Sequence, residues 1–129
     1  MRKSDNPTRI NPADISVYRQ DWHDFTRFIF VNGGGSVQIE LYKEPIERVS
    51  CKALLYALWV DEPVRSQGCA TALMDISEKT AKEMGYSEIA LEWSLFDSPY
   101  QVFNWYERRG YDEKAFDGRG TYSVMIKQL

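Results

Sequence analysis

The stretch VRSQGCATALM, from Val64 to Met74, places a glycine directly before a run of residues with helical spacing. It follows the apolar run CKALLYALWV, from Cys51 to Val60, which is typical of a buried central strand. After Gly68, apolar residues recur on one helix face as far as Met84, and Gly85 is a natural stop. Unpaired N–H groups at the start of such a helix attract anions. The stretch therefore predicts either a plain connector or a phosphate-binding loop.

The composition narrows the class of protein. The 129 residues carry 16 Lys and Arg against 19 Asp and Glu, a net charge of −3, and the basic residues are spread along the chain, so we expect no nucleic-acid partner. No apolar run is long enough to span a bilayer, and the polar segment MRKSDNPTRINP does not resemble a signal peptide, so we expect a cytoplasmic protein without a membrane partner. The single histidine, His23, argues against a histidine triad or a metal site, and Cys51 and Cys69 are expected to be free thiols.

The remaining patterns predict one domain spanning residues 1–129, an α/β fold with a mixed sheet and helices on both faces. A first helix is expected from Pro12 to His23, where apolar residues recur at near-helical spacing. The triple-glycine segment of residues 32–35 is expected to be a hairpin turn, because no helix follows it. The other expected elements are strands at residues 25–31, 36–42 and 87–94, a helix from Ser98 to Gly110, and a closing hairpin of residues 111–116 and 122–129.

Two segments, LWVDEPVRSQGCATALM and VFNWYERRGY, together resemble the GNAT superfamily of acetyl-CoA-dependent N-acetyltransferases. The family's acyl-CoA loop reads Arg/Gln-x-x-Gly-x-Gly/Ala, which Arg65, Gly68 and Ala70 match, and its second signature is matched by Tyr106 and by the pair Gly110-Tyr111. The resemblance covers residues 8–129 in the order of elements, but its specific motifs occupy only residues 58–74 and 102–111.

The resemblance implies a V-shaped opening between the strand at residues 51–60 and the strand at residues 89–93. Acetyl-CoA would be the donor cosubstrate in this opening, and a primary amine on a small molecule or peptide would attack it directly in a ternary complex. The general acid that protonates the leaving sulfur would be Tyr106, and a backbone N–H near Val60 would stabilise the oxyanion. The implied donor site has two parts: pantetheine pairs with Leu58, Trp59 and Val60, and the pyrophosphate sits on Arg65, Ser66, Gln67, Gly68, Cys69, Ala70 and Thr71.

Several points stay open at the level of sequence. Pro99 stands where many family members carry an asparagine, and the second N-terminal helix of the family is absent from the pattern. The acceptor side is therefore expected to be open or completed by another subunit, as in a homodimer, and a non-catalytic acyl-CoA-binding module is the alternative function. Tyr106 has a second interpretation as a core aromatic, and Cys69 is expected to pack rather than react. The sequence does not identify a general base: Asp61, Glu62, Glu92 and a water relay are the candidates.

Overall fold

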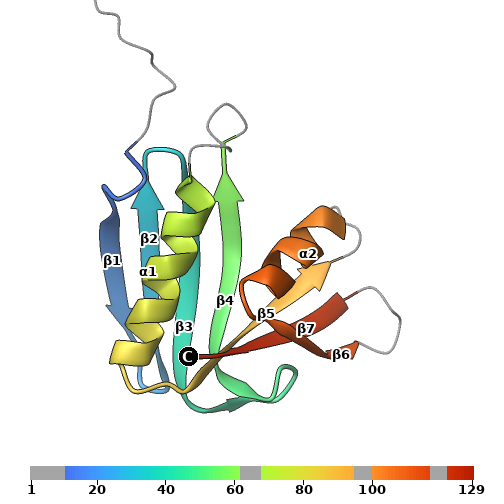
Figure 1. Cartoon of the computed structure of the whole chain (residues 1–129). Coiled ribbons are helices and arrows are strands. Elements are labelled where there is room, and N and C mark those ends of the chain that lie inside the picture. Colours follow the sequence, from blue (N-terminus) through green and yellow to red (C-terminus); the bar gives the residue numbers. More distant parts are fainter. Residues whose placement is uncertain (1–10, 62–67, 95–99, 117–121) are drawn as a thin grey trace, which may run out of the picture.

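The computed structural model describes residues 11–61, 68–94, 100–116 and 122–129. Within them the chain forms a seven-stranded sheet with two helices (Figure 1). The elements are β1 Ser16–Asp21, β2 Phe25–Asn32, β3 Gly35–Ile46, β4 Cys51–Val60, α1 Cys69–Glu83, β5 Glu88–Ser94, α2 Tyr100–Arg108, β6 Asp112–Phe116 and β7 Tyr122–Gln128.

The strands lie in the order β1-β2-β3-β4-β5-β7-β6. All neighbouring strands are antiparallel except β4 and β5, which are parallel because α1 connects them across one face. The predicted mixed sheet is confirmed. The hairpin at the triple glycine is also confirmed, since Asn32 pairs with Gly35 at the end of β2 and β3.

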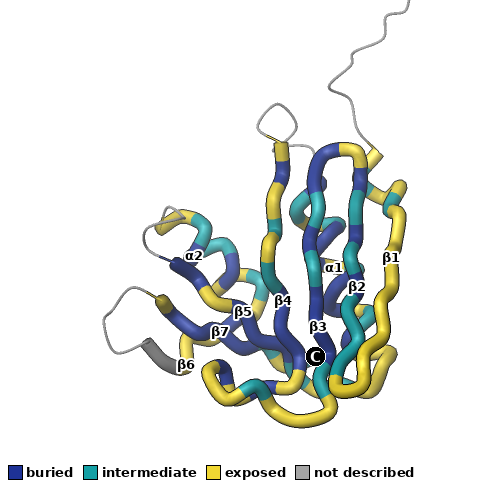
Figure 2. The backbone as a smooth tube through the Cα atoms, turned by 180° about the vertical axis from the view of Figure 1, so that it is seen from behind, coloured by how far each residue is buried: buried dark blue, intermediate teal, exposed yellow. Residues whose placement is uncertain are grey.

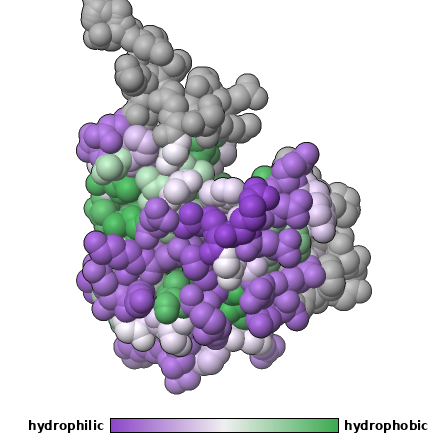
Figure 3. All heavy atoms as spheres, viewed as in Figure 1, coloured by the Kyte–Doolittle hydropathy of each residue, from purple (hydrophilic) through white to green (hydrophobic). Residues whose placement is uncertain are grey.

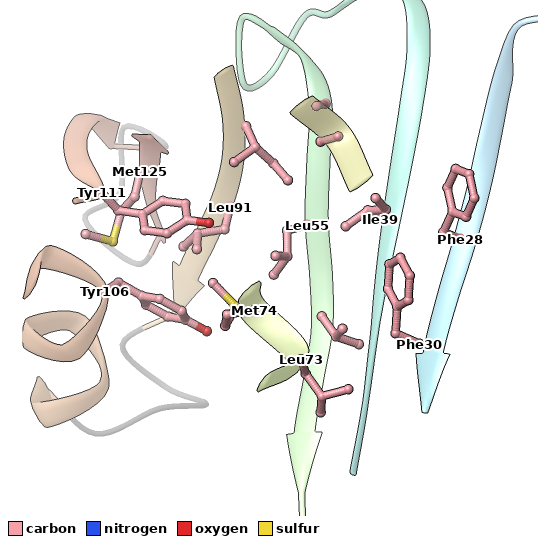
Figure 4. Packing of buried hydrophobic residues seen from close by; sticks show 14 of the residues in the cluster. Phe28, Phe30, Ile39, Leu55, Leu73, Met74, Leu91, Tyr106, Tyr111 and Met125 are labelled. Carbon is pink, nitrogen blue, oxygen red and sulfur yellow. The ribbon is translucent and has the colours of Figure 1, made fainter. Parts of the chain in front are cut away.

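Both helices lie on the same face of the sheet, against the expectation of helices on both faces. One core cluster joins Leu73 and Met74 of α1 with Phe103 and Tyr106 of α2, and Figure 4 shows Met74 and Tyr106 in the part of this cluster that includes Leu91 of β5. Apolar side chains that alternate along β2, β3, β4, β5 and β7 supply the sheet side of this cluster. Figure 1 shows the two helices in front of the sheet, and Figure 3 shows that hydrophilic residues dominate their outer surface.

The expected helix from Pro12 to His23 is wrong, and the second face of the sheet carries no helix among the described residues. Residues 16–21 instead form β1, which pairs with β2 at the edge of the sheet and is exposed along its whole length. An edge strand that buries neither face has no alternating apolar pattern, so the near-helical spacing of its few apolar residues was misleading.

The reverse face of the sheet, seen in Figure 2, carries a smaller apolar cluster and a polar network. The cluster centres on Leu54 of β4 and Ala90 of β5. In the network, the buried carboxylate of Glu40 accepts hydrogen bonds from Arg27 at 2.7 Å and from the hydroxyls of Tyr42 at 2.7 Å and Tyr56 at 2.9 Å. Burial alone would raise the pKa of Glu40, but these hydrogen bonds lower it, so the carboxylate stays ionised.

Candidate active site

The two central strands diverge immediately after they meet. β4 and β5 share only the register pair Leu54–Ala90, whereas β3 and β4 pair along most of their length. In β4, a register shift lies between the pairs Gln38–Tyr56 and Ser36–Trp59, and Ala57 in this bulge has a φ of 57°. A bulge bends a strand. β4 therefore leaves the ladder of β5, and the expected V-shaped opening between the two strands is present.

A pocket of about 360 Å³ occupies this opening. It is lined from both faces of the sheet, because Leu55 and Leu91 belong to the helix side whereas Tyr56 and Glu92 belong to the reverse side. Among the described residues, its lining is Leu55, Tyr56, Ala57, Leu58, Leu91, Glu92, Ser94, Tyr106 and Tyr122. The opening thus connects the helix face with the open reverse face.

Tyr106 is both a core aromatic and a lining residue of this pocket. Its ring is 8% exposed and packs against Tyr111, with ring centroids 5.8 Å apart, and Figure 4 shows it directed from α2 toward the sheet. Burial raises the pKa of Tyr106 to about 12, although the nearby Arg109 guanidinium opposes this shift. The phenol is therefore protonated throughout the neutral range and can donate a proton.

The start of α1 supplies the described part of the expected pyrophosphate loop. Gly68 precedes the helix with a φ of 83°, and a Cβ built on it would meet only the Pro12 ring, at 3.8 Å, among the described residues. Cys69 is completely buried in the core, whereas Thr71 is exposed and Ala70 is half-buried. Arg65, Ser66 and Gln67 lie outside the described residues, as do Ser98 and Pro99.

The residues expected to bind pantetheine lie at the end of β4. Leu58 is half-buried and lines the pocket, the Trp59 side chain is 56% exposed, and Val60 is buried. Leu58 and Trp59 are thus accessible at the end of β4, as are Gly68 and Thr71 at the start of α1.

The candidate bases differ in their surroundings. Glu92 lines the pocket, and its carboxylate pairs with Arg48 at 3.2 Å. Asp61 is exposed at the end of β4, and Glu62 lies outside the described residues. Sequence reasoning missed Tyr56 and Tyr122, which line the reverse side of the pocket. Alternation along β4 could have placed Tyr56 on that face, but the bulge that turns it toward the opening left no sequence signal.

Two further findings concern metals and membranes, within the residues that the structure describes. No group of three or more potential metal ligands occurs there. No described helix has the length and apolar character that a transmembrane segment requires.

Comparisons with known proteins identify the family. The acetyltransferase (GNAT) family matches residues 11–111. Among solved structures, a Klebsiella pneumoniae putative acyl-CoA N-acyltransferase superposes with a TM-score of 0.66 at 14% identity, over 91% of this chain and 99% of that one. An Elizabethkingia anophelis GNAT acetyltransferase with acetyl-CoA bound gives a TM-score of 0.64 at 10% identity, over 90% and 99%.

The PaiA N-acetyltransferase of Thermoplasma acidophilum, in complex with coenzyme A, gives a TM-score of 0.63 at 18% identity over 82% of this chain and 62% of that chain. At these identities the structures establish the shared fold. No curated protein matched the sequence in the corresponding search. Since the family match spans most of the sequence, the chain belongs to the GNAT acetyltransferase family.

Proposed function

We propose that the protein transfers an acetyl group from acetyl-CoA to a primary amine, by direct attack within a ternary complex. The observation that carries the proposal is the pocket between β4 and β5, where Tyr106 lines an opening that reaches both faces of the sheet. Two cosubstrates can approach such an opening from opposite sides. The acetyl-CoA and coenzyme A in two structures of the same fold support the choice of donor.

The donor would bind along the end of β4 and the start of α1. The residues fit an acyl-CoA because Gly68 leaves open space beside the first N–H groups of α1, where the helix dipole favours a pyrophosphate. The backbone of Leu58, Trp59 and Val60 would pair with the pantetheine amides in the manner of an added strand. Arg65, Ser66 and Gln67 remain part of the proposal as the residues that precede Gly68.

The chemistry requires a neutral amine, a stabilised oxyanion and a protonated leaving group. The amine nitrogen attacks the thioester carbonyl carbon, and the oxyanion accepts a hydrogen bond from a backbone N–H near Val60. As the C–S bond breaks, the Tyr106 hydroxyl donates its proton to the sulfur, and the amine gives up one proton. The products are the acetamide and free CoA, and the tyrosinate regains its proton from solvent.

The amine would enter from the reverse face, since no described helix covers that face of the sheet. Tyr56 and Tyr122 line the pocket there, and phenols bind amines through hydrogen bonds and cation–π contacts. Glu40 and Glu92 on this side are each paired with an arginine, and a water relay is the route that we propose for the amine proton.

The decisive experiment is an acetyl-CoA consumption assay with polyamines, aminoglycosides, amino acids and peptides as acceptors. We expect free thiol to appear with at least one acceptor class, together with an acetylated product in mass spectrometry. Binding of CoA without turnover of any acceptor would instead support the alternative, a non-catalytic acyl-CoA-binding module. Absence of CoA binding by calorimetry would refute both.

A further inference from the structure

The glycine turn between β2 and β3 contacts both sides of the proposed donor site. We call Asn32, Gly34 and Gly35 the glycine clamp. Gly35 pairs with Val60 at the end of β4. A Cβ built on Gly35 would overlap the Trp59 carbonyl oxygen and lie 2.9 Å from the Val60 Cα. Only glycine therefore allows β3 to approach the end of β4 this closely, and the approach fixes the backbone of Trp59 and Val60.

Gly34, the second residue of the clamp, contacts the residue that follows β4. The Asp61 backbone N–H donates a hydrogen bond of 2.7 Å to the carbonyl of Gly34. β4 is thus held to the turn at Trp59, Val60 and Asp61, which are the last described residues before the gap that ends at Gly68.

The third member connects the turn to α1. Asn32 is 6% exposed, and its side-chain oxygen accepts a hydrogen bond of 3.1 Å from the Gly34 N–H. Its amide nitrogen donates to the Cys69 carbonyl at 3.4 Å and to the Pro12 carbonyl at 3.3 Å. Cys69 is the first residue of α1, so this amide ties the start of the helix to the same turn that holds β4.

We propose that the glycine clamp positions the end of β4 and the start of α1 relative to each other and thereby sets the affinity for CoA, with Asn32 as its positioning residue. The inference rests on the proposed function, because it assigns the two held segments to one ligand. A site that is held in place before binding loses less conformational entropy when the ligand arrives. Asn32 does this as a buried residue, through its hydrogen bonds to Gly34 and Cys69.

The test compares three variants by calorimetry with CoA, at a temperature where thermal melts show each to be folded. Asn32→Asp keeps the bond from Gly34 but cannot donate to Cys69 or Pro12, and Asn32→Ala removes the side-chain bonds without adding charge. Asn11→Asp is the matched control, since the exposed Asn11, in its contacts with described residues, accepts a hydrogen bond from Ala13 through its side-chain oxygen, and an aspartate retains that bond. We expect about tenfold weaker CoA binding for both Asn32 variants, because each loses the two hydrogen bonds that the side-chain amide donates, and parent-like binding for the control.

Parent-like CoA affinity in the folded Asn32 variants, with only a lower melting temperature, would overturn the clamp and leave Asn32 a purely structural residue. Weaker binding by Asn32→Asp alone would also overturn it, because charge rather than positioning would then be the cause. If the parent protein binds no CoA, the proposed function is wrong, and amide hydrogen exchange then tests whether Asn32 holds the start of α1. Faster exchange in Asn32→Asp at Ala72, whose N–H bonds to the Gly68 carbonyl, with unchanged exchange in the last turn of α1, would support it; equal exchange at Ala72 would refute it.

Discussion

At the scale of single residues, Tyr106 combines a ring fixed in the core with a hydroxyl in the pocket. Tyr106→Phe keeps the ring and removes the hydroxyl that would donate the proton, so kcat should fall by roughly 10²–10⁴-fold while CoA affinity changes little. Steady-state rates with a working acceptor, together with matching thermal melts, measure the effect. A loss near the lower end is expected, because a thiolate leaves readily without much help. Parent-like kcat in a well-folded Tyr106→Phe protein would assign the acid role to another group.

Gly68 offers a second test at this scale, because the chain contains a matched control. Gly68 and Gly85 flank α1, and both have positive φ angles, 83° and 97°. A valine at either position is strained by a similar amount, but only Gly68→Val fills the space assigned to the pyrophosphate. We therefore expect comparable losses of melting temperature and a loss of CoA binding in Gly68→Val alone. Calorimetry would contradict the proposed pyrophosphate site at Gly68 if both variants bound CoA equally.

Cys69 illustrates how burial constrains reactivity. Its side chain is fully buried in the core at the start of α1, which supports packing and leaves no room for an acyl intermediate. Cys69→Ala should lose some stability through the small cavity it creates but retain most of its turnover. Mass spectrometry of the parent after mixing with acetyl-CoA should show an unmodified Cys69, and an acetyl group trapped there would exclude direct attack.

At the scale of elements, one carboxylate ties both helices to the sheet. Glu78 of α1 accepts hydrogen bonds from Tyr111 at 2.7 Å, from Lys127 of β7 at 2.8 Å and from Arg109 at 3.1 Å. Arg109 also pairs with Asp75 at 2.7 Å, one turn earlier in α1. These contacts fix the C-terminal end of α2, and therefore the helix that carries Tyr106, against α1.

Removal of this carboxylate should destabilise the fold. Glu78→Ala removes the acceptor of the buried Tyr111 hydroxyl, of Lys127 and of one Arg109 hydrogen bond, so we expect a loss of about 2–3 kcal/mol in the free energy of unfolding. Asp75→Ala is the control: its side chain is 64% exposed, and its loss should cost less than about 1 kcal/mol. Urea denaturation measures both. Equal losses in the two variants would show that burial does not distinguish the two carboxylates.

The elements also show where sequence reasoning succeeds. β4 was predicted with the bounds that the structure gives, because a run of ten mostly apolar residues between polar segments has few alternatives. α1 was predicted to within one residue at its start, because Gly68 marks it. β1 was predicted as a helix because its conformation comes from pairing with β2, a long-range contact that no local pattern encodes.

At the scale of the whole molecule, the buried phenols make stability depend on alkaline pH. Burial raises the pKa of Tyr106 and of Tyr42 to about 12, and it also raises that of Tyr111. A raised pKa means that the folded state holds the proton more tightly than the unfolded state, whose tyrosines titrate near 10. The stabilisation is therefore complete below pH 10 and is lost as the pH rises toward 12.

Tyr106 alone accounts for roughly 2–3 kcal/mol of this loss, since its pKa is displaced by about two units. Thermal melts from pH 8 to 11.5 should show a falling midpoint above pH 10, with a shallower fall in Tyr106→Phe. Identical profiles for the two proteins would mean that the Tyr106 phenol titrates normally in the folded state.

The sequence predicted which strands and helices form the candidate site, but it did not predict the contacts that their side chains make there. The two motifs place Gly68 and Tyr106 on separate helices, and the family resemblance alone brought them to one opening. The pairing of Glu92 with Arg48, 44 residues away in the chain, depends on how the sheet brings the two residues together, so sequence could only rank Glu92 as one possible base. The entry of Tyr56 into the pocket depends on the bulge at Ala57, a backbone conformation that alanine rarely adopts.

The single register pair between β4 and β5 has a consequence for how the molecule unfolds. Backbone hydrogen bonds bind strands β1–β4 into one half-sheet and β5–β7 into another, but they hardly join the two halves. The union depends on side chains, above all on the core cluster that α1 shares with both halves. The two half-sheets are thus potential units of partial unfolding. A ligand bound between them would add the contacts that backbone hydrogen bonds do not supply, so that the two halves would unfold together.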